Sequence, residues 1–400
     1  MSKYFKSIYI FVTLFSLFFT FSTKTMAWRF VAWGDTKTGT ATLTSLSPQV
    51  VNLNPVFTIY AGDSVDSWGS SVVSNNFNNF TKAINGGPAN NGLFNKTFAV
   101  RGNHEGSSST EGWQTAWDFL GLVTKIGGSN YKELTKELTY SFDYQNAHFI
   151  GVDVLGDASN ITSAQIAWID SDLTSAEARG IKHSFIWFHG PIYCAAEHCS
   201  CSTTTGCVST AAISLIKVLN KHSSISATFH GHEHVYVYTH LDDKRIPEVP
   251  GMKPIEQFIT GDAGAGPATT KSNRYDYWLN KHGFVTVDIN SDTAYTVSIY
   301  AQGSSTPDKV YNFNKTATTP VPTAAVTPTP VVTKTPTPIV TPTKVPTPTP
   351  IATKTPTPTP STSKLPTPTP SSTVNLRYDL NNDGRVDLLD IMTLIKVLFI

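Results

Sequence analysis

Nine short apolar segments are spaced along residues 28–315, and each is rich in β-branched and aromatic side chains. Segments of this length and composition are typical of buried β-strands. Between them, residues 163–178 and 210–220 have the polar or amphipathic pattern of helices. The alternation predicts a layered α/β domain over residues 28–315. The predicted strands are residues 29–33, 56–61, 97–100, 148–154, 184–188, 225–229, 257–260, 284–289 and 295–300.

Polar residues with metal-binding side chains stand directly after five of these strands, each time next to a glycine. In an α/β sheet, ligands bind at the carboxyl ends of the strands. Carboxylate, amide and imidazole groups together suit Zn, Mn or Fe. Each residue alone could simply belong to a turn, but the whole set in this order predicts a metal centre. The set comprises Asp35, Asp63 in GDSVD, Asn103 and His104 in GNHE, His189, and His232 and His234 in GHEH.

The motif order D, GDxxD, GNH[DE], H, GHxH resembles the signature of the calcineurin-like metallophosphoesterases, and it extends from Asp35 to His234. The resemblance implies a four-layer αββα sandwich with two divalent metal ions, Zn, Mn or Fe, at the strand ends. It also implies that Asp63 bridges the two ions. Asp35 and His234 would complete one site, and the other would take Asn103, His189 and His232.

The chemistry implied by this resemblance is hydrolysis of phosphate mono- or diesters by a metal-activated hydroxide. Two adjacent cations lower the pKa of a shared water and neutralise charge on the phosphoryl oxygens. Asn103 would also orient the phosphate, and His104 would give a proton to the leaving group. Glu105 would position the loop or His104. The paired carboxylates of a glycosidase are not evident in the sequence.

Lys37 departs from the family pattern, in which the residue two positions after the first Asp is usually His. A charged ammonium cannot bind a metal ion and is repelled by one. Three interpretations stay open. Lys37 contacts the phosphate, with a weaker or single metal; another residue replaces the missing ligand; or activity is lost and the protein is a binding or assembly component.

Asp66 stands where the similar purple acid phosphatases have a tyrosine that colours their ferric iron. A purple iron–tyrosinate centre is therefore not expected.

Residues 1–27 have the pattern of a cleaved signal peptide: two lysines precede an apolar run of about 14 residues, and small residues end the segment. The run is shorter than the roughly 20 residues of a membrane-spanning helix. An uncleaved anchor is the alternative. We therefore expect a secreted, extracellular protein with no membrane attachment after cleavage. The net charge of +1 also argues against a nucleic-acid-binding surface.

All four cysteines lie within fourteen residues. In an exported protein they predict two disulfides, for which three pairings are possible. A four-cysteine zinc site is the alternative, although the usual C-x2-C spacing is absent. The segment begins five residues after His189, so it should lie near the metal centre. The candidates are Cys194, Cys199, Cys201 and Cys207.

Residues 316–375 form a Pro/Thr-rich linker that contains sixteen of the 25 prolines. Such a composition favours polyproline II and predicts a semi-rigid spacer.

Residues 376–400 begin with a pattern that predicts a calcium loop of EF-hand type, followed by a short apolar helix. With the linker, this pattern resembles one repeat of a type I dockerin. The resemblance implies docking to a cohesin module of a scaffoldin in a cellulosome-type complex, with Leu388 and Leu389 helping to select the partner. Dockerins normally have two repeats, so a single one could instead dock weakly, pair with another copy or only bind calcium. The predicted calcium ligands are Asp379, Asn381, Asp383, Arg385, Asp387 and Asp390.

Overall fold

The computed structural model describes residues 27–69, 74–199 and 206–315. The predicted linker and calcium module, and all of the predicted signal peptide except its last residue, lie outside these residues. None of the helices in the described ranges is both long and apolar enough to cross a membrane.

The first sheet has six strands in the order β16-β15-β14-β1-β2-β3. Strands β1, β2 and β3 are parallel, whereas β14, β15 and β16 add to the edge of β1 in antiparallel fashion. The carboxyl ends of β1, β2 and β3 therefore lie at the same edge of this sheet. The bounds are β1 Trp28–Trp33, β2 Phe57–Tyr60, β3 Thr97–Ala99, β14 Gly283–Ile289, β15 Ala294–Ala301 and β16 Lys309–Asn314.

The second sheet has eight strands in the order β13-β11-β12-β10-β7-β6-β5-β4. Its four central strands, β12, β10, β7 and β6, are parallel. A separate two-stranded ladder pairs β8 (Tyr193–Cys194) with β9 (Cys207–Val208). The bounds are β4 Ser129–Thr135, β5 Thr139–Tyr144, β6 Ala147–Gly151, β7 His183–Trp187, β10 Ile225–His230, β11 Tyr236–Leu241, β12 Ile255–Thr260 and β13 Tyr277–Leu279.

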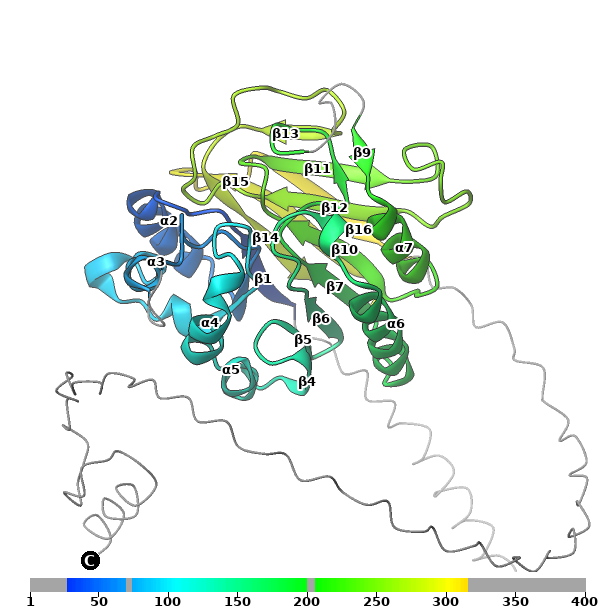
Figure 1. The fold of residues 1–400 in the computed structure, drawn as a ribbon, viewed down its shortest axis with the longest axis horizontal. Helices are drawn as coiled ribbons and strands as arrows, with labels where there is room; N and C mark the ends of the chain where they lie inside the picture. Colours follow the sequence, from blue (N-terminus) through cyan, green and yellow to red (C-terminus); the bar gives the residue numbers. More distant parts are fainter. Residues whose placement is uncertain (1–26, 70–73, 200–205, 316–400) are drawn as a thin grey trace, which may run out of the picture. The chain divides into compact units, whose positions relative to one another are not determined.

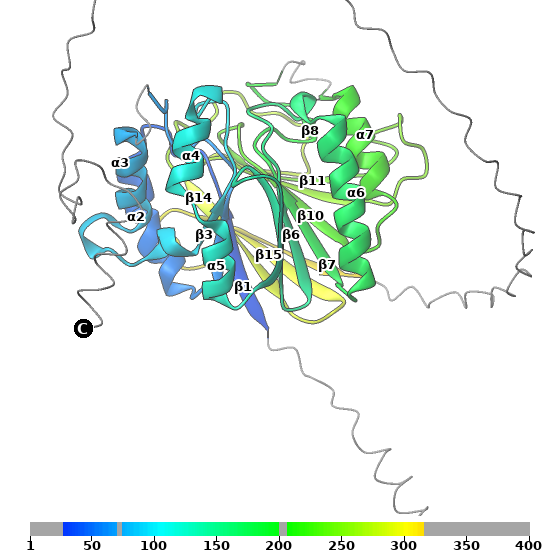
Figure 2. The same cartoon turned by 60° about the horizontal axis from the view of Figure 1, so that its bottom comes forward.

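Helices cover the outer faces of both sheets (Figures 1 and 2). Helices α2 (Thr40–Asn52) and α3 (Asn75–Ile84) bury their apolar residues in the same core as the first sheet. Helices α6 (Ser163–Ala178) and α7 (Thr210–Leu219) pack against the second. The remaining helices are α4 Thr110–Ala116, α5 Phe119–Ile126 and the 3-10 helices Gly87–Ala89, Leu93–Lys96, Ser107–Ser109 and Ala158–Asn160.

An aromatic core joins the inner faces of the two sheets. Phe30 of β1 lies edge-on to Phe149 of β6 and Phe185 of β7, with ring centroids 5.2 and 5.1 Å apart. All three side chains are fully buried. Edge-to-face aromatic pairs add about 0.5–1.5 kcal/mol each to the gain from burial. The layers are thus helix, sheet, sheet and helix, and the expected mixed α/β sandwich is confirmed.

Candidate metal centre

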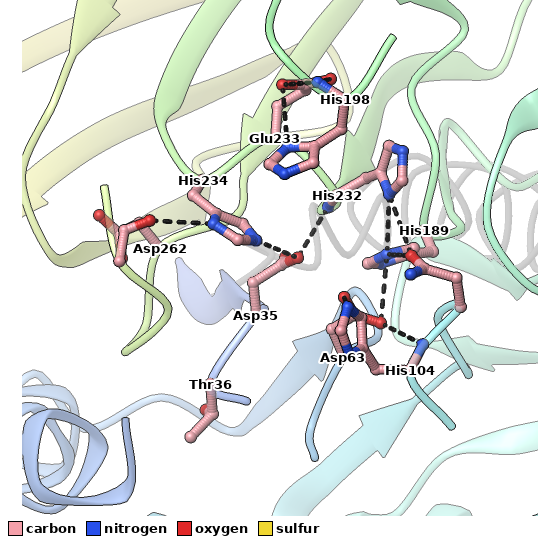
Figure 3. A network of polar contacts seen from close by, with 12 residues as sticks. Asp35, Thr36, Asp63, His104, His189, His198, His232, Glu233, His234 and Asp262 are labelled. Atoms are coloured by element: carbon pink, nitrogen blue, oxygen red, sulfur yellow. Dashed lines mark hydrogen bonds and ion pairs between the residues drawn. The ribbon is translucent and has the colours of Figure 1, made fainter. Parts of the chain in front are cut away.

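Five strand ends from the two sheets meet at one edge of the sandwich. Asp35, Asp63 and Asn103 follow β1, β2 and β3, while His189 and His232 follow β7 and β10. Backbone hydrogen bonds continue between these loops, from Asp35 N to Gly62 O (3.0 Å) and from Gly231 N to His189 O (2.8 Å). The sheets therefore hold the loops in register, and their polar side chains point toward a common centre (Figure 3).

Three of the predicted ligands cluster around a fourth, His189. Its Nε2 atom lies 3.3 Å from Asp63 Oδ1, 3.0 Å from Asn103 Oδ1 and 3.3 Å from His232 Nδ1. His189 Nδ1 donates to the carbonyl of Ala61 (2.8 Å), which leaves Nε2 directed at this cluster. A backbone acceptor that fixes the ring in this way is the usual support for a histidine ligand of a metal ion.

The other two predicted ligands lie beside this cluster. Asp35 is fully buried, and its Oδ1 accepts from the backbone N–H of His232 (2.9 Å) and lies 4.0 Å from His234 Nε2. His234 Nδ1 donates to Gly266 O (2.9 Å), so its Nε2 faces Asp35. The second oxygen of Asp35, Oδ2, is buried and has no hydrogen-bond partner among the described residues.

The backbone at these positions adopts an uncommon conformation. Asp35, Asp63 and His232 have φ angles of 57°, 51° and 71°, in the left-handed region. Non-glycine residues there are strained and tend to cluster at functional sites. The neighbouring glycines leave room for the carboxylates. A Cβ on Gly102 would lie 2.1 Å from Asp63 Oδ1, and a Cβ on Gly231 would lie 2.2 Å from Asp35 Oδ2, so a larger residue would clash at either position.

The protonation states of the clustered side chains favour binding of a cation. Burial raises the pKa of Asp35 well above its usual range. Burial also disfavours charge on His189, yet the carboxylates of Asp63 and Asp35 raise the pKa of this histidine to about 10. Mainly through burial, the pKa values of His232 and His234 fall to about 3 and 4, which keeps both rings neutral. Buried carboxylates beside neutral imidazoles and an unpartnered carboxylate oxygen fit divalent metal ions.

Comparison with known proteins assigns this arrangement to a family. Residues 29–236, more than half of the chain, match the family model described as calcineurin-like phosphoesterase. The chain belongs to this family. It is therefore a member of a family of phosphoester hydrolases that bind a dimetal centre.

Solved structures share the fold. The purple acid phosphatase PPD1 of yellow lupin (Lupinus luteus) is 14% identical with a TM-score of 0.52, and the match covers 72% of this chain and 54% of the lupin chain. This chain thus spans about half the length of the lupin enzyme. A dimetal phosphatase from Danio rerio is 13% identical with a TM-score of 0.46, and 72% and 99% of the two chains are covered. No curated protein matches the sequence significantly.

Glu105 organises the loops that carry the predicted ligands. The buried carboxylate accepts hydrogen bonds from the backbone N–H groups of Gly102 (2.6 Å), Asp63 (3.2 Å) and Ser64 (2.7 Å). This is the loop-positioning role expected for Glu105. His104 lies at the open side, where its Nδ1 is 2.6 Å from Asp66 O and its Nε2 is 3.8 Å from Asp63 Oδ2.

Lys37 lies on the Asp35 side of the centre and is half-buried. Its backbone N–H donates to Asp63 O (3.1 Å), and its φ of 50° is also left-handed. After burial and the charge of His198, the charge of Lys37 is a further cause of the low pKa of His234. The ammonium group has no ion-pair partner among residues 27–69, 74–199 and 206–315.

His198 and Glu233 are residues at this centre that the sequence motifs did not single out. Glu233 is fully buried between the two histidines of the GHEH motif, and both its oxygens accept from His198 N (3.0 and 3.2 Å). The ring of His198 lies 4.7 Å from that of His234 and 5.6 Å from that of His232. The one local feature of the sequence that could have pointed to His198 is its position next to Cys199.

The predicted disulfide segment does lie next to the centre. Cys194 and Cys199 form a disulfide, which is one of the pairings that the sequence allowed. Cys207 is also disulfide-bonded, whereas Cys201 lies outside the described residues. The loop closed by Cys194 and Cys199 carries His198 to the centre.

Proposed function

We propose that this protein hydrolyses phosphate mono- or diesters at a dimetal centre. Asp63 would bridge two divalent ions, with Asp35 and His234 on one side and Asn103, His189 and His232 on the other. The observation that carries the proposal is the convergence of these six side chains from five strand ends, with the carboxylates of Asp35 and Asp63 buried beside His189. Bound there, the two ions would lower the pKa of a water and neutralise charge on the phosphoryl oxygens.

The side chains around the ions divide the remaining tasks. Asn103 is exposed at the open side of the centre, where its amide can orient a phosphate oxygen. His104 donates through Nδ1 to Asp66 O, so its ring is held with Nε2 toward the centre. This position suits proton donation to the leaving group.

The test of this function uses protein freed of metal and then supplied with Zn, Mn or Fe(II). Hydrolysis of a chromogenic phosphate monoester and diester is measured for each metal. Metal-dependent turnover is the expected result. A folded protein without turnover on either ester would contradict the proposal.

Replacing His104 by Ala should lower kcat about 10²- to 10⁴-fold on an alkyl phosphate, the usual contribution of a positioned general acid. The loss should be smaller on nitrophenyl phosphate, because nitrophenolate leaves without a proton. His240→Ala provides the control, since His240 pairs with Glu256 on β11–β12 outside the centre. Equal losses on the two substrates would argue that His104 has a different role.

We further propose that Lys37 contacts the phosphate in place of a metal ligand. A hydrogen bond to a charged group is worth about 1.5–3 kcal/mol, so Lys37→Met should lower kcat/KM for a monoester about 10- to 100-fold. The loss for a diester should be smaller, because the diester carries one negative charge fewer. Lys281→Met, on the exposed surface, is the matched control. Unchanged kinetics on both esters would exclude a contact between Lys37 and the phosphate.

A second candidate function is a binding or assembly component with an impaired centre, which the presence of Lys37 at the ligand position favours. Turnover that appears only after Lys37→His, with a gain in bound metal, would support this alternative. Metal-dependent turnover by the unchanged protein would exclude it.

We also propose that the protein is secreted and attaches through its calcium loop to a cohesin module of an extracellular complex. The sequence pattern from Asp379 to Asp390 supports this proposal. Calorimetric titration of the full chain with a cohesin module should show binding in calcium and none in a calcium chelator. Absence of binding in calcium would leave the phosphoesterase proposal standing and remove the attachment.

A further inference from the structure

A second group of metal-binding atoms lies behind the predicted dimetal centre. The sulfurs of Cys194 and Cys199 lie 3.3 and 3.2 Å from Glu233 Oε1. The other carboxylate oxygen, Oε2, lies 3.5 Å from His198 Nδ1. The two sulfurs and the Glu233 carboxylate are thus close enough to one another to share one metal ion, and the imidazole of His198 borders this group through Oε2.

The disulfide offers no hydrogen-bond donor to the carboxylate of Glu233 beside it. Glu233 is fully buried, and its two oxygens share one backbone donor, His198 N. On its other side, Oε1 faces two sulfurs that carry no proton while they are bonded to each other. A buried carboxylate is stabilised by hydrogen-bond donors or by a cation. Thiols would donate to Oε1, and a metal ion held by thiolates would bind it. The surroundings of Glu233 therefore fit the reduced cysteines better than the disulfide.

The distances suit a tetrahedral site. With Zn–S bonds of about 2.3 Å and a Zn–O bond of about 2.1 Å, the sulfur–oxygen edge of a tetrahedron is about 3.6 Å. Both sulfur–oxygen distances here are already within 0.4 Å of that length. After cleavage, the sulfurs must separate to about 3.8 Å, which side-chain rotation from Cα atoms 5.8 Å apart can provide.

We propose that reduction of the Cys194–Cys199 disulfide creates a third metal site in which Cys194, Cys199 and Glu233 bind the ion and His198, which contacts Glu233, turns to supply the fourth ligand. A dithiol reduces the bond by thiol–disulfide exchange: its two sulfurs become a disulfide, and two electrons and two protons pass to Cys194 and Cys199. Zn²⁺ then replaces the two thiol protons, which are released to solvent. Two thiolates, an imidazole and a carboxylate favour Zn²⁺ among the abundant divalent ions.

The proposed site would couple the redox state of the loop to the position of His198. In the oxidised protein, the disulfide holds the loop next to the centre; in the reduced protein, the metal would do so. Because Glu233 lies between His232 and His234, the third site and the dimetal centre share one backbone segment. The inference does not depend on the phosphoesterase activity, since none of the dimetal ligands is a sulfur atom.

The test uses the full chain with Cys201→Ser and Cys207→Ser, so that Cys194 and Cys199 are the remaining cysteines. A phosphine reduces the disulfide and is removed without oxygen, and the metal-free protein is titrated with Co²⁺. We expect a sulfur-to-cobalt charge-transfer band whose final intensity corresponds to one thiolate-bound cobalt per chain and which disappears when Zn²⁺ is added. The oxidised protein should give no such band, because it has no thiolate.

Variants then identify the ligands. Further substitution of Cys194 and Cys199 by Ser should abolish the band, and Glu233→Gln or His198→Ala should weaken cobalt binding about tenfold or more. His240→Ala should leave it unchanged. A reduced protein that lacks the band overturns the proposal, whether circular dichroism shows it folded or unfolded. A band with unchanged affinity in Glu233→Gln overturns the proposed ligand set. Ester hydrolysis by the oxidised protein is measured separately, so failure of one proposal is distinguishable from failure of the other.

Discussion

Asp63→Asn is expected to abolish metal-dependent hydrolysis of phosphate esters. The Asp63 side chain lies between the two halves of the centre, 3.3 Å from His189 Nε2 through Oδ1. Asparagine keeps its shape but removes the charge, and with it the proposed bridge between two cations. Metal ions contribute several kcal/mol of transition-state stabilisation, so the loss should be about a thousandfold or more in kcat. Initial rates with saturating Zn, Mn or Fe(II) measure it.

A thermal-unfolding series separates loss of metal from loss of fold. A ligand that binds the native state at a hundredfold excess over its Kd adds about 2.7 kcal/mol of stability. Metal should therefore raise the Tm of the unchanged protein clearly, and that of Asp63→Asn much less. Glu248→Gln, which removes an exposed carboxylate, should behave as the unchanged protein. Full activity and a full metal-induced shift in Asp63→Asn would rule out a bridging role.

The strands that carry the predicted ligands could be read from the sequence because their signal is local. Each of the nine predicted segments corresponds to a strand, from β1 to β15. The other strands were missed. Of these, β4 and β16 are exposed edge strands without a continuous apolar run. The rest are β5, β8, β9, β11 and β13. Helices α2 and α3 were missed as well. The first contains Pro48 and many Thr and Ser residues, and the second contains four asparagines, all poor helix formers.

The site itself was only partly predictable. Asp35, Asp63 and Asn103 each stand beside a glycine after an apolar run, so the chain position alone places them at strand ends. His198 has no such context. A disulfide and hydrogen bonds to Glu233 bring it to the centre. The disulfide is one of several pairings that the cysteine spacing allowed, and Glu233 lies 35 residues further along the chain. Long-range contacts of this kind leave no local pattern.

The buried ionic cluster around His148 could not be predicted from the sequence either. It is the basis of a second prediction with a large expected effect. His148 is fully buried, with Nδ1 2.6 Å from Asp143 Oδ1 and Nε2 2.9 Å from Asp172 Oδ2. Because both ring nitrogens face carboxylates, both carry a proton and the ring is cationic. Arg179 and Lys132 neutralise the remaining carboxylate charge and tie β4, β5, β6 and α6 together.

His148→Ala should destabilise the protein by about 3–5 kcal/mol, because it removes the fully buried cation that lies between Asp143 and Asp172 and leaves only the partly exposed Arg179 and Lys132 to pair with them. Urea unfolding of the full chain measures the loss. His222→Ala is the matched control, since His222 also pairs with two carboxylates, those of Asp170 and Glu177, whose side chains are 31% and 28% exposed. A partly exposed cluster is worth about 1 kcal/mol or less.

The pH dependence of this loss distinguishes an ionic cluster from simple packing. Burial opposes charge on His148, but hydrogen bonds to Asp143 and Asp172 raise its pKa above the usual value. Its contribution to stability is therefore complete below its unfolded pKa of about 6.5 and is lost as pH rises through the raised folded pKa. Against the effect of burial, the cationic partners lower the pKa values of Asp143 and Asp172. Their contribution is present above about pH 3.9 and is lost as pH falls.

The cost of His148→Ala should consequently be largest between about pH 4 and pH 6.5 and smaller near pH 9. A void alone would cost the same at every pH, because the transfer and cavity contributions of a removed side chain do not titrate. Equal losses at pH 5.5 and pH 9 would thus assign His148 to packing rather than to charge. The predicted difference would show instead that a cationic side chain holds the outer edge of the second sheet to α6, on the sheet whose other strands position His189 and His232.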